Sequence, residues 1–457
     1  MVDTAEHALA LIWTALGGTS DGPRAVHLIG EGNLPSVFAV SDLAGASVGA
    51  ACLAVAELVA ACHGRQLQAT VDRRLASLWL GTSIRPDGWK MPAPWDVVAG
   101  DYQASDGWIR LHTNAPRHRA AALAVLDAPA DREQVVRAVR TWQADALETA
   151  VVQNGGCAAA MRDLAGWAEH PQGRAIAAEP LLIHEARTAG PMPNWAVPPN
   201  RPLHGVRVLD LTRVLAGPVA TRFLAGFGAE VLRIDPPDWD EPSIAPDVVL
   251  GKRCARLDLR RQPDRELWER LLSQADVLVH GYRPGALAGL GLDAERRRAL
   301  CPGLVEVSLD AYGWSGPWEG RRGFDSLVQM SAGIADAGMR RMGRDRPTPL
   351  PVQALDHATG YLMAAAAVRG LTERLATGKG CSARASLART AVLLTELPLG
   401  QPTLFAPETP DDQAEAVEAT AWGPARRLKA PGGIEGAPMR WDLPATALGS
   451  AAAAWTA

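Results

Sequence analysis

An alternation of short apolar runs and amphipathic stretches between residues 206 and 313 restricts the fold more than any other feature of this chain. The apolar runs span residues 206–212, 230–235, 275–282 and 304–313. Helical spacing occurs over residues 219–227 and again before the third run. Short buried strands that alternate with helices are typical of a parallel sheet with helices on both faces. The sequence therefore predicts an α/β fold for this part of the chain.

The rest of the chain divides around a region rich in proline and glycine. The 457 residues exceed what one hydrophobic core usually covers, so two lobes are expected. Residues 1–195 are predicted to be mainly helical, with a hairpin or small sheet around Ser105-Asp106-Gly107. Proline and glycine are dense from residue 190 to residue 205, which places the linker at 196–204 and the second lobe at 205–457.

An internal repeat links the two lobes at an offset of 314 positions, where Asp42 is matched by Asp356. The same offset pairs Pro35 with Pro349, Gly64 with Gly378, and Ala69 with Ala383. Matches between alanines in alanine-rich helices carry little weight, whereas the acid and the glycine turn carry more. The sequence thus predicts a duplicated unit of acid, helix, turn and strand.

Composition and charge exclude several classes of protein. The net charge of -4 offers no basic field for nucleic acid or for an anionic membrane. The six cysteines lack a C-x-x-C pattern and a histidine at metal-ligand spacing, which favours a reduced, cytoplasmic compartment and no metal site. The apolar run from Ala50 to Cys62 is broken by Glu57 and is shorter than a membrane span. Neither nucleic acid nor membrane is therefore an expected partner.

Candidate ligand contacts cluster in the loops of the predicted sheet. Arg213 follows the first strand, and Gly217-Pro218 opens a helix whose amino end could face an anion. A G-x-G-x-x-G fingerprint for nicotinamide dinucleotides is absent, and a plain strand-to-helix turn is the alternative. Further cations and one aromatic residue follow at Lys252, Arg253, Tyr282 and Arg283. Singly these are surface residues; together they indicate a nucleotide-like ligand.

Asp356 lies between an extended stretch and an alanine-rich helix. An acid in this position can cap the helix by accepting backbone N–H groups, and most such acids do nothing more. The same geometry would keep the carboxylate ionised and aimed in one direction, so that it could attack an activated acyl group. No G-x-S-x-G elbow, Walker loop or H-E-x-x-H helix offers a rival hydrolase or metalloenzyme site.

Five segments carry a family resemblance through their order and spacing. They begin with "GVRVLDLTRVLAGPVATRFLAGFGAEVLRIDPP" and continue through "GKRCARLDLR", "ADVLVHGYRPGALAGLGL", "LVEVSLDAYGWSGPWEGRRGFDSLVQMSAGI" and "PVQALDHATGYLMAAAAVRGLTERLATGKG". This part of the chain, about residues 203–390, resembles the CoA-binding half of family III CoA-transferases, a group that includes related acyl-CoA racemases. Residues 1–195 resemble a truncated copy that carries the family's small domain at about 90–175.

The resemblance implies a Rossmann-like sheet for CoA, a helical segment and a small α+β domain in an interlocked arrangement. It implies either a homodimer or a pseudo-dimer within one chain, because by this resemblance the chain joins two partial copies. It further implies an acyl-CoA and a small carboxylic acid as substrates, with no tightly bound cofactor. The CoA contacts implied are Arg213, Leu215, Ala216, Lys252, Arg253, Tyr282 and Arg283.

In the family mechanism an aspartate, here Asp356, attacks the acyl-CoA to give a mixed anhydride and then an aspartyl-CoA thioester. Asp42 has the same frame but no CoA-binding half before it, so a structural cap is expected there. Racemases carry a histidine where Phe324 stands, and the glycine run of formyl-CoA transferases has no counterpart in residues 87–100. CoA transfer is the favoured activity, and an acyl-CoA racemase or isomerase and a non-catalytic CoA-binding fusion remain alternatives.

Overall fold

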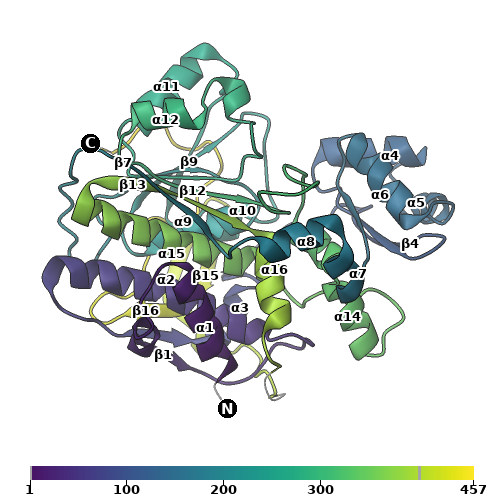
Figure 1. Cartoon of the computed structure of the whole chain (residues 1–457), viewed down its shortest axis with the longest axis horizontal. Helices are drawn as coiled ribbons and strands as arrows, with labels where there is room; N and C mark the ends of the chain where they lie inside the picture. The colour runs from purple at the N-terminus through teal and green to yellow at the C-terminus, as the bar shows by residue number, and fades with distance from the viewer. Residues whose placement is uncertain (1–2, 400–402, 457) are drawn as a thin grey trace.

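A seven-stranded sheet with strand order β10-β9-β8-β11-β12-β13-β7 forms the centre of the molecule (Figure 1). The structure is a computed structural model that describes residues 3–399 and 403–456. The strands are β7 (Ile183–Ala189), β8 (Arg207–Leu211), β9 (Glu230–Asp235), β10 (Lys252–Arg256), β11 (Val277–His280), β12 (Val305–Asp310) and β13 (Lys379–Ser386). Only the β13–β7 pair is antiparallel. The expected strands are all present, and the parallel order is that of a doubly wound sheet.

Helices cover both faces of this sheet, as the α/β prediction requires. On one face the core contains Val208 and Val305 together with helices α9 (Ala216–Gly226) and α15 (Ala354–Thr377). On the other face Leu209 packs with helices α11 (Gln262–Leu272) and α12 (Ala294–Leu300). Neighbouring strand residues thus belong to opposite cores because side chains alternate along a strand.

The predicted duplicated unit occurs twice, with helix boundaries that match. Helix α2 (Val40–His63) and helix α15 each have 24 residues, and both end at a left-handed glycine, Gly64 with φ 66° and Gly378 with φ 72°. Strand β2 (Ala69–Asp72) and helix α3 (Arg73–Trp79) follow α2, as β13 and helix α16 (Leu387–Glu396) follow α15. The two long helices pack side by side, and Figure 1 shows them as neighbouring layers.

Helix α2 is longer than the apolar run expected from residue 50 to residue 62. By length and composition it could cross a membrane, and it is the only helix of the described residues that could. Inside the protein, 89% of its most apolar window is buried. Its hydrophobicity is therefore accounted for by the core that it shares with α15.

The small domain is an antiparallel sheet covered by helices, which confirms the expected hairpin. Its strands are β4 (Gly100–Gln103), β5 (Trp108–Leu111) and β6 (Ala158–Ala160), and its helices are α4 (Pro116–Leu126), α5 (Arg132–Val139) and α6 (Ala144–Gln153). These elements have a hydrophobic core of their own. They project to one side of the molecule in Figure 1.

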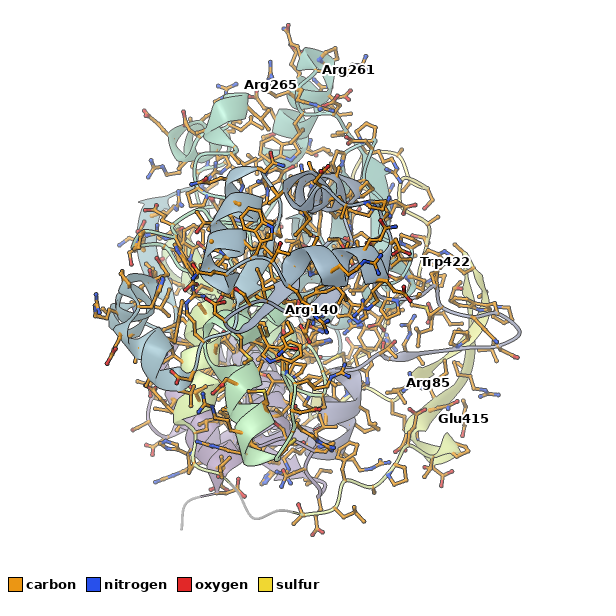
Figure 2. All side chains as sticks on the ribbon, turned by 90° about the vertical axis from the view of Figure 1, so that its right-hand side faces the viewer. Arg85, Arg140, Arg261, Arg265, Glu415 and Trp422 are labelled. Atoms are coloured by element: carbon orange, nitrogen blue, oxygen red, sulfur yellow. The ribbon has the colours of Figure 1, made fainter. Side chains whose placement is uncertain are left out.

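The two sequence halves exchange strands. Strand β7, from the first half, pairs with β13 of the second, and strand β16 (Gly432–Ile434), near the C-terminus, pairs with β2 of the first. Strand β15 (Gly423–Leu428) likewise pairs with β3 (Ile84–Pro86) and with β14 (Gln413–Thr420). Figure 2 shows this last sheet extending from the body, with Arg85, Glu415 and Trp422 on it. The predicted linker 196–204 therefore connects halves that already share sheets.

The remaining elements are short. They are α1 (Thr4–Ala15), β1 (Val26–Ile29), α7 (Leu164–Glu169), α8 (Pro171–Ala178), α10 (Ala245–Val248), α13 (Asp325–Ser331) and α14 (Ile334–Arg341). Three 3-10 helices lie at Gly22–Ala25, Ala288–Leu290 and Pro410–Asp412. Of these elements, α13 matters most for the site because it begins beside the start of α15.

Candidate functional site

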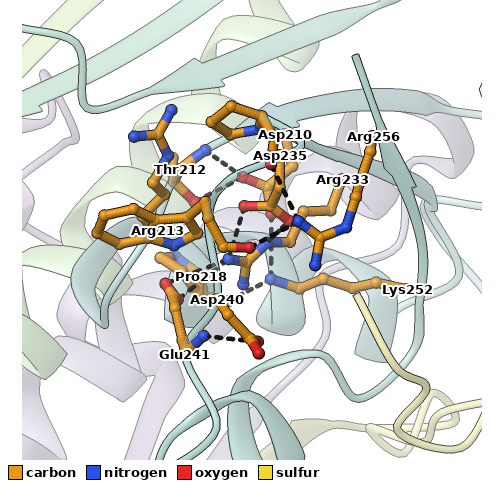
Figure 3. Close-up of polar contacts among 12 residues, drawn as sticks. Asp210, Thr212, Arg213, Pro218, Arg233, Asp235, Asp240, Glu241, Lys252 and Arg256 are labelled. Carbon is orange, nitrogen blue, oxygen red and sulfur yellow. Dashed lines mark hydrogen bonds and ion pairs between the residues drawn. The ribbon is translucent and has the colours of Figure 1, made fainter. Parts of the chain in front are cut away.

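The loop from β8 to α9 is held in an uncommon backbone conformation. Val214 has φ 64°, a left-handed value that a β-branched residue rarely adopts. Its N–H donates to the Glu241 carboxylate at 2.7 Å, and Arg233, fully buried, donates to the same carboxylate at 3.1 Å. A buried ion pair therefore fixes the turn that leads into Ala216, the first residue of α9 (Figure 3).

A second buried network, centred on Asp210, also holds this loop in place. The Asp210 carboxylate accepts hydrogen bonds from the Thr212 N–H at 2.8 Å and from the Thr221 hydroxyl at 2.5 Å. The Lys252 ammonium lies 3.1 Å from that carboxylate and donates to the Pro218 carbonyl at 2.9 Å (Figure 3). Lys252 is 0% exposed, so the expectation that it contacts CoA is corrected. Its strand begins in the interior, and the ammonium ties the loop to the sheet.

Burial lowers the pKa of Lys252 to about 8, with Asp210 opposing the change. Burial alone would raise the pKa of Asp210, but Lys252 and Arg233 outweigh it and leave that pKa below its ordinary value. The network is therefore an ionised one whose stability depends on both partners. Its role is to hold the backbone amides at the start of α9 in place.

Asp356 lies at the third position of α15, with Gln353 as the N-cap, so its side chain is not the helix cap that one interpretation expected. Its carboxyl group instead accepts the N–H of Ala216 on α9. Gly360, one turn later, permits this approach, because a Cβ there would lie 2.4 Å from the Ala216 carbonyl oxygen. Asp356 is 7% exposed.

A second carboxyl group, Asp325, lies beside Asp356. Asp325 is 1% exposed and accepts the Asp356 N–H at 2.9 Å. Burial raises the pKa of Asp356 well above its usual value, and the neighbouring Asp325 raises it further. Burial also raises the pKa of Asp325 to about 6. The expectation that Asp356 is held ionised is therefore corrected, because burial and a negative charge on Asp325 both favour its protonated form.

The expected CoA contacts divide between two ends of the sheet. Arg213 and Tyr282 follow the carboxyl ends of β8 and β11, and the Arg213 guanidinium donates to the Tyr282 hydroxyl at 3.3 Å. The guanidinium also stacks on the Trp239 ring at 4.9 Å. Arg253 lies at the opposite end, where it is bound to Glu230 at 3.3 Å. The expectation that Arg253 contacts CoA in the same site as Arg213 and Tyr282 is therefore corrected.

Two arginines that the sequence did not single out join this cluster. Burial lowers the pKa of Arg117, at the start of α4 in the small domain, and the nearby guanidiniums of Arg322 and Arg213 lower it further. Within residues 3–399 and 403–456, none of these three arginines makes an ion pair with a carboxylate. Three arginines that lie near one another without carboxylate partners have the charge to attract a polyanion. Arg283, also expected, is exposed and donates to the Gly320 carbonyl at 3.4 Å.

The small domain meets the site at Phe324, the residue before Asp325. The His112 ring stacks on Phe324 with centroids 3.6 Å apart, and the His118 ring approaches its edge at 5.9 Å. His118 is 3% exposed, and neither of its ring nitrogens has a hydrogen-bond partner. Burial lowers the pKa of His118 to about 4 and that of His112 to about 3. The contact joins segments far apart in the sequence, so no local pattern predicts it.

Asp42, the counterpart of Asp356, has a different partner. Its carboxylate forms an ion pair with Arg73, whose guanidinium also donates to the Asn33 side chain and to the Gly32 carbonyl. Burial raises the pKa of Asp42, and Arg73 opposes that change. Asp42 is therefore a buried ion-pair residue, and the expectation of a helix cap is corrected, since the side chain makes no cap hydrogen bond.

Within the described part of the chain, no group of three histidine, cysteine or acidic side chains could hold a metal ion. All six cysteines are free thiols.

Residues 203–426 match the family model described as CoA-transferase family III, which confirms the resemblance for that part of the chain. The chain is 36% identical over 191 residues to an acetyl-coenzyme A transferase, nodX, of Hypoxylon pulicicidum, covering 41% of this chain and 32% of the relative. It is 33% identical over 197 residues to a succinyl-CoA–D-citramalate CoA-transferase of Chloroflexus aurantiacus, covering 40% of this chain and 48% of the relative.

The chain is also 28% identical over 311 residues to an acyl-CoA transferase of Gibberella moniliformis, covering 63% of this chain and 54% of the relative. It thus spans about a third to a half of the length of these curated relatives. Among solved structures, a CAIB/BAIF family protein from Brucella suis is similar with a TM-score of 0.40 and 28% identity, over 49% of this chain and 65% of that one.

Proposed function

We propose that this chain, whose residues 203–426 belong to CoA-transferase family III, is an enzyme that transfers CoA from an acyl-CoA to a small carboxylic acid with Asp356 as its nucleophile. The observation that carries the proposal is the setting of Asp356. It is a buried carboxyl group without a cation, directed at the amino end of α9 and placed beside a second carboxyl group. A carboxylate deprived of solvent and of an ion pair is a stronger nucleophile than one in water.

In the proposed reaction the Asp356 carboxylate attacks the thioester carbonyl carbon. A C–O bond forms, the C–S bond breaks, and CoA leaves as the thiolate with an aspartyl anhydride on the enzyme. The thiolate then attacks the aspartyl carbonyl carbon, which releases the donor acid as a carboxylate and leaves an aspartyl-CoA thioester. The acceptor carboxylate repeats both steps in the opposite sense. Asp356 has to ionise for this attack, and a charge on Asp325 opposes that ionisation because two adjacent buried charges are costly.

The CoA phosphates would bind the unpaired arginines at the carboxyl end of the sheet. Arg213, Arg117 and Arg322 supply the charge, and Tyr282 and Trp239 supply flat surfaces for a base. Leu215 and Ala216 remain proposed backbone contacts, and the exposed Arg283 an outer one. The small domain would then close the site from the same chain, as an intrachain pseudo-dimer, and a homodimer and a cytoplasmic location also remain proposals.

Intact-protein mass spectrometry after incubation with a panel of acyl-CoAs tests the nucleophile. A CoA-sized adduct, or a product trapped by borohydride or hydroxylamine, is expected on the unmodified chain and not on Asp356→Ala. The matched control is Asp42→Ala, which should still form the adduct. Adducts that persist in Asp356→Ala would refute the assignment. CoA binding with no adduct and no turnover for any donor would favour a non-catalytic fusion.

A racemase remains the second candidate because of His118. Phe324 occupies the position of the racemase histidine, but the His118 imidazole lies at the edge of that ring with both nitrogens free. Such a group could exchange a proton on the acyl α-carbon with Asp356 as the opposite acid or base. Incubation of a 2-methylacyl-CoA in D2O distinguishes the two. Deuterium at the α-carbon without an acceptor acid indicates a racemase, and its absence together with CoA transfer indicates a transferase.

A further inference from the structure

Gln329 is a buried residue of α13, one turn after Asp325, and it is 1% exposed. Its side-chain amide bridges two segments of the site. Nε2 donates to Oδ1 of Asp325, and Oε1 accepts the Leu350 N–H at 2.7 Å. Leu350 belongs to the stretch that runs into α15, where Asp356 is the third residue. Gln329 therefore connects the helix that carries Asp325 with the segment that leads to Asp356.

The two partners of Gln329 allow its amide only one orientation. A backbone N–H can only donate, so the amide oxygen has to face Leu350. The amide nitrogen, which donates and does not accept, then has to face Asp325. Unlike a hydroxyl group, which can rotate between donating and accepting, Gln329 therefore offers Asp325 a donor whatever the protonation state of the acid pair.

Both oxygens of Asp325 accept hydrogen bonds. Oδ1 accepts from Gln329, and Oδ2 accepts the Asp356 N–H at 2.9 Å, with the Leu355 N–H as a further donor. Among the donors that residues 3–399 and 403–456 supply to Asp325, Gln329 is the side chain and the others are backbone groups. An N–H group bonds more strongly to a carboxylate than to a neutral carboxyl group, so these contacts favour a charged Asp325.

The other charged groups on the elements around α13 are engaged elsewhere. They are Arg110 on β5 with Asp101, Asp336 on α14 with Arg340, and Arg389 on α16 with the Glu179 carbonyl. His112 on β5 and His357 on α15 are neutral, because burial lowers the pKa of each to about 3. Burial raises the pKa of Asp325 to about 6, and its hydrogen bonds and the Arg110 charge oppose that rise.

We propose that Gln329 is the positioning residue of the acid pair, which holds the Asp325 carboxyl group so that Asp325 takes the first negative charge and Asp356 keeps its proton. Its effect on Asp356 is indirect, through Asp325. Without the Gln329 amide, Asp325 would be neutral over a wider pH range, and Asp356 would ionise at lower pH. The effect on rate rests on the proposed function of Asp356, whereas the effect on the charge of Asp325 does not.

The stability of Gln329→Met between pH 4 and pH 8 tests the charge of Asp325 without any substrate. Methionine has about the same length and no donor. The pH at which Asp325 loses its proton in the folded chain should rise by about 1 unit, so the stability deficit of the variant should grow with pH. In an Asp325→Asn background the deficit should not depend on pH. Ser331→Ala, which removes a buried hydroxyl of α13 that contacts Tyr312, is the matched control and should leave the pH dependence unchanged.

Gln329→Glu guards against misfolding of Gln329→Met. While protonated, a glutamic acid at this position can make both hydrogen bonds, so the variant should be as stable as the unmodified chain at pH 4. Above that pH it should lose stability more steeply than Gln329→Met, because a third buried carboxyl group then has to ionise.

The pH profile of CoA transfer tests the effect on Asp356. In Gln329→Met the rise of kcat with pH should begin at a lower pH, while KM for the acyl-CoA changes less than about threefold. A purely structural loss would lower kcat equally at every pH. The inference is overturned if the stability of Gln329→Met and that of the unmodified chain change with pH in the same way, or if the deficit still grows with pH in the Asp325→Asn background. The stability shift without CoA transfer by the unmodified chain would uphold the role of Gln329 and refute the reaction instead.

Discussion

Helices α2 and α15 carry an acid at the same turn, and the two acids have opposite partners. Asp42 is bound to Arg73, whereas Asp356 faces Asp325 and the Ala216 amide. The position that matches Arg73 in the second unit is Leu387, a buried apolar residue. One repeated backbone thus supports an ion pair in one place and a carboxyl group without a cation in the other. The chemistry available to each acid therefore depends on its partners and not on the repeated backbone alone.

The sharpest test of this contrast removes each acid in turn. Asp356→Ala should lower kcat for CoA transfer on the order of a thousandfold or more, because the covalent route is lost. Asp42→Asn should change kcat less than about threefold, since Asp42 touches none of the groups proposed to react. Steady-state kinetics with a donor that labels the protein would measure both. Equal losses in the two variants would contradict the contrast.

The ion pair of the first unit can be broken from its other side. Arg73→Met would leave Asp42 buried and unpaired, and the free energy of unfolding should fall by about 3–5 kcal/mol at neutral pH. Adding Asp42→Asn should restore most of the lost free energy of unfolding, because no buried charge is then left unpaired. Urea unfolding measures both. Leu387→Met at the matching position is the control, with an expected change below about 1.5 kcal/mol.

The acid pair of the second unit should respond to pH in the opposite direction from an ion pair. Burial raises the pKa of Asp325 from 3.8 to about 6, so the folded protein binds more protons than the unfolded chain between these values. Its contribution to stability is complete below pH 3.8 and is lost as pH rises through about 6, a change of about 3 kcal/mol.

Unfolding free energies of the unmodified chain and of Asp325→Asn, measured from pH 4 to pH 7, test this point. Relative to the variant, the unmodified chain should lose stability as pH rises. A relative gain would mean that Asp325 behaves as an ion-paired acid.

The smallest expected effect concerns the fit of α15 on α9. Gly360→Ala would place a Cβ 2.4 Å from the Ala216 carbonyl oxygen and push the two helices apart. A displacement of about 1 Å can cost about a hundredfold in rate, so kcat should fall tenfold to a hundredfold without unfolding. Ala46→Gly, the matching position in α2, should leave kcat unchanged. If both variants have normal kcat, the close approach of Gly360 does not position Asp356.

The sequence predicted the elements better than their contacts. Strand and helix periodicity and the glycine turns are local, so the β8–α9 loop, the Asp356 helix and the repeat could be read from residues near each other. The burial of Lys252 could not be predicted in this way, because a basic side chain at the start of a strand can point either to solvent or to the interior. Arg253 was misplaced because it is the second residue of β10, and the amino ends of parallel strands lie at the opposite edge from Arg213 and Tyr282.

The partners of the acids were also hidden. Asp325 and Arg73 are each 31 residues from the acid that they contact, with a different intervening path in each unit. The pairing of β7 and β16 with strands of the other half and the stacking of His112 on Phe324 join segments at least 190 residues apart, and no local pattern records such pairing. These contacts can be identified only when the fold is known.

The strand exchange has a consequence for the order in which the protein is made. Ala69 of β2 pairs with Ile434 of β16, so one edge of the first unit has no partner until the ribosome has added about 360 more residues. At 5–20 residues per second this takes roughly 20–70 s. During that time the edge is open to strands of other nascent chains. The yield of folded protein should therefore depend on translation speed and on chaperones that shield the emerging first half.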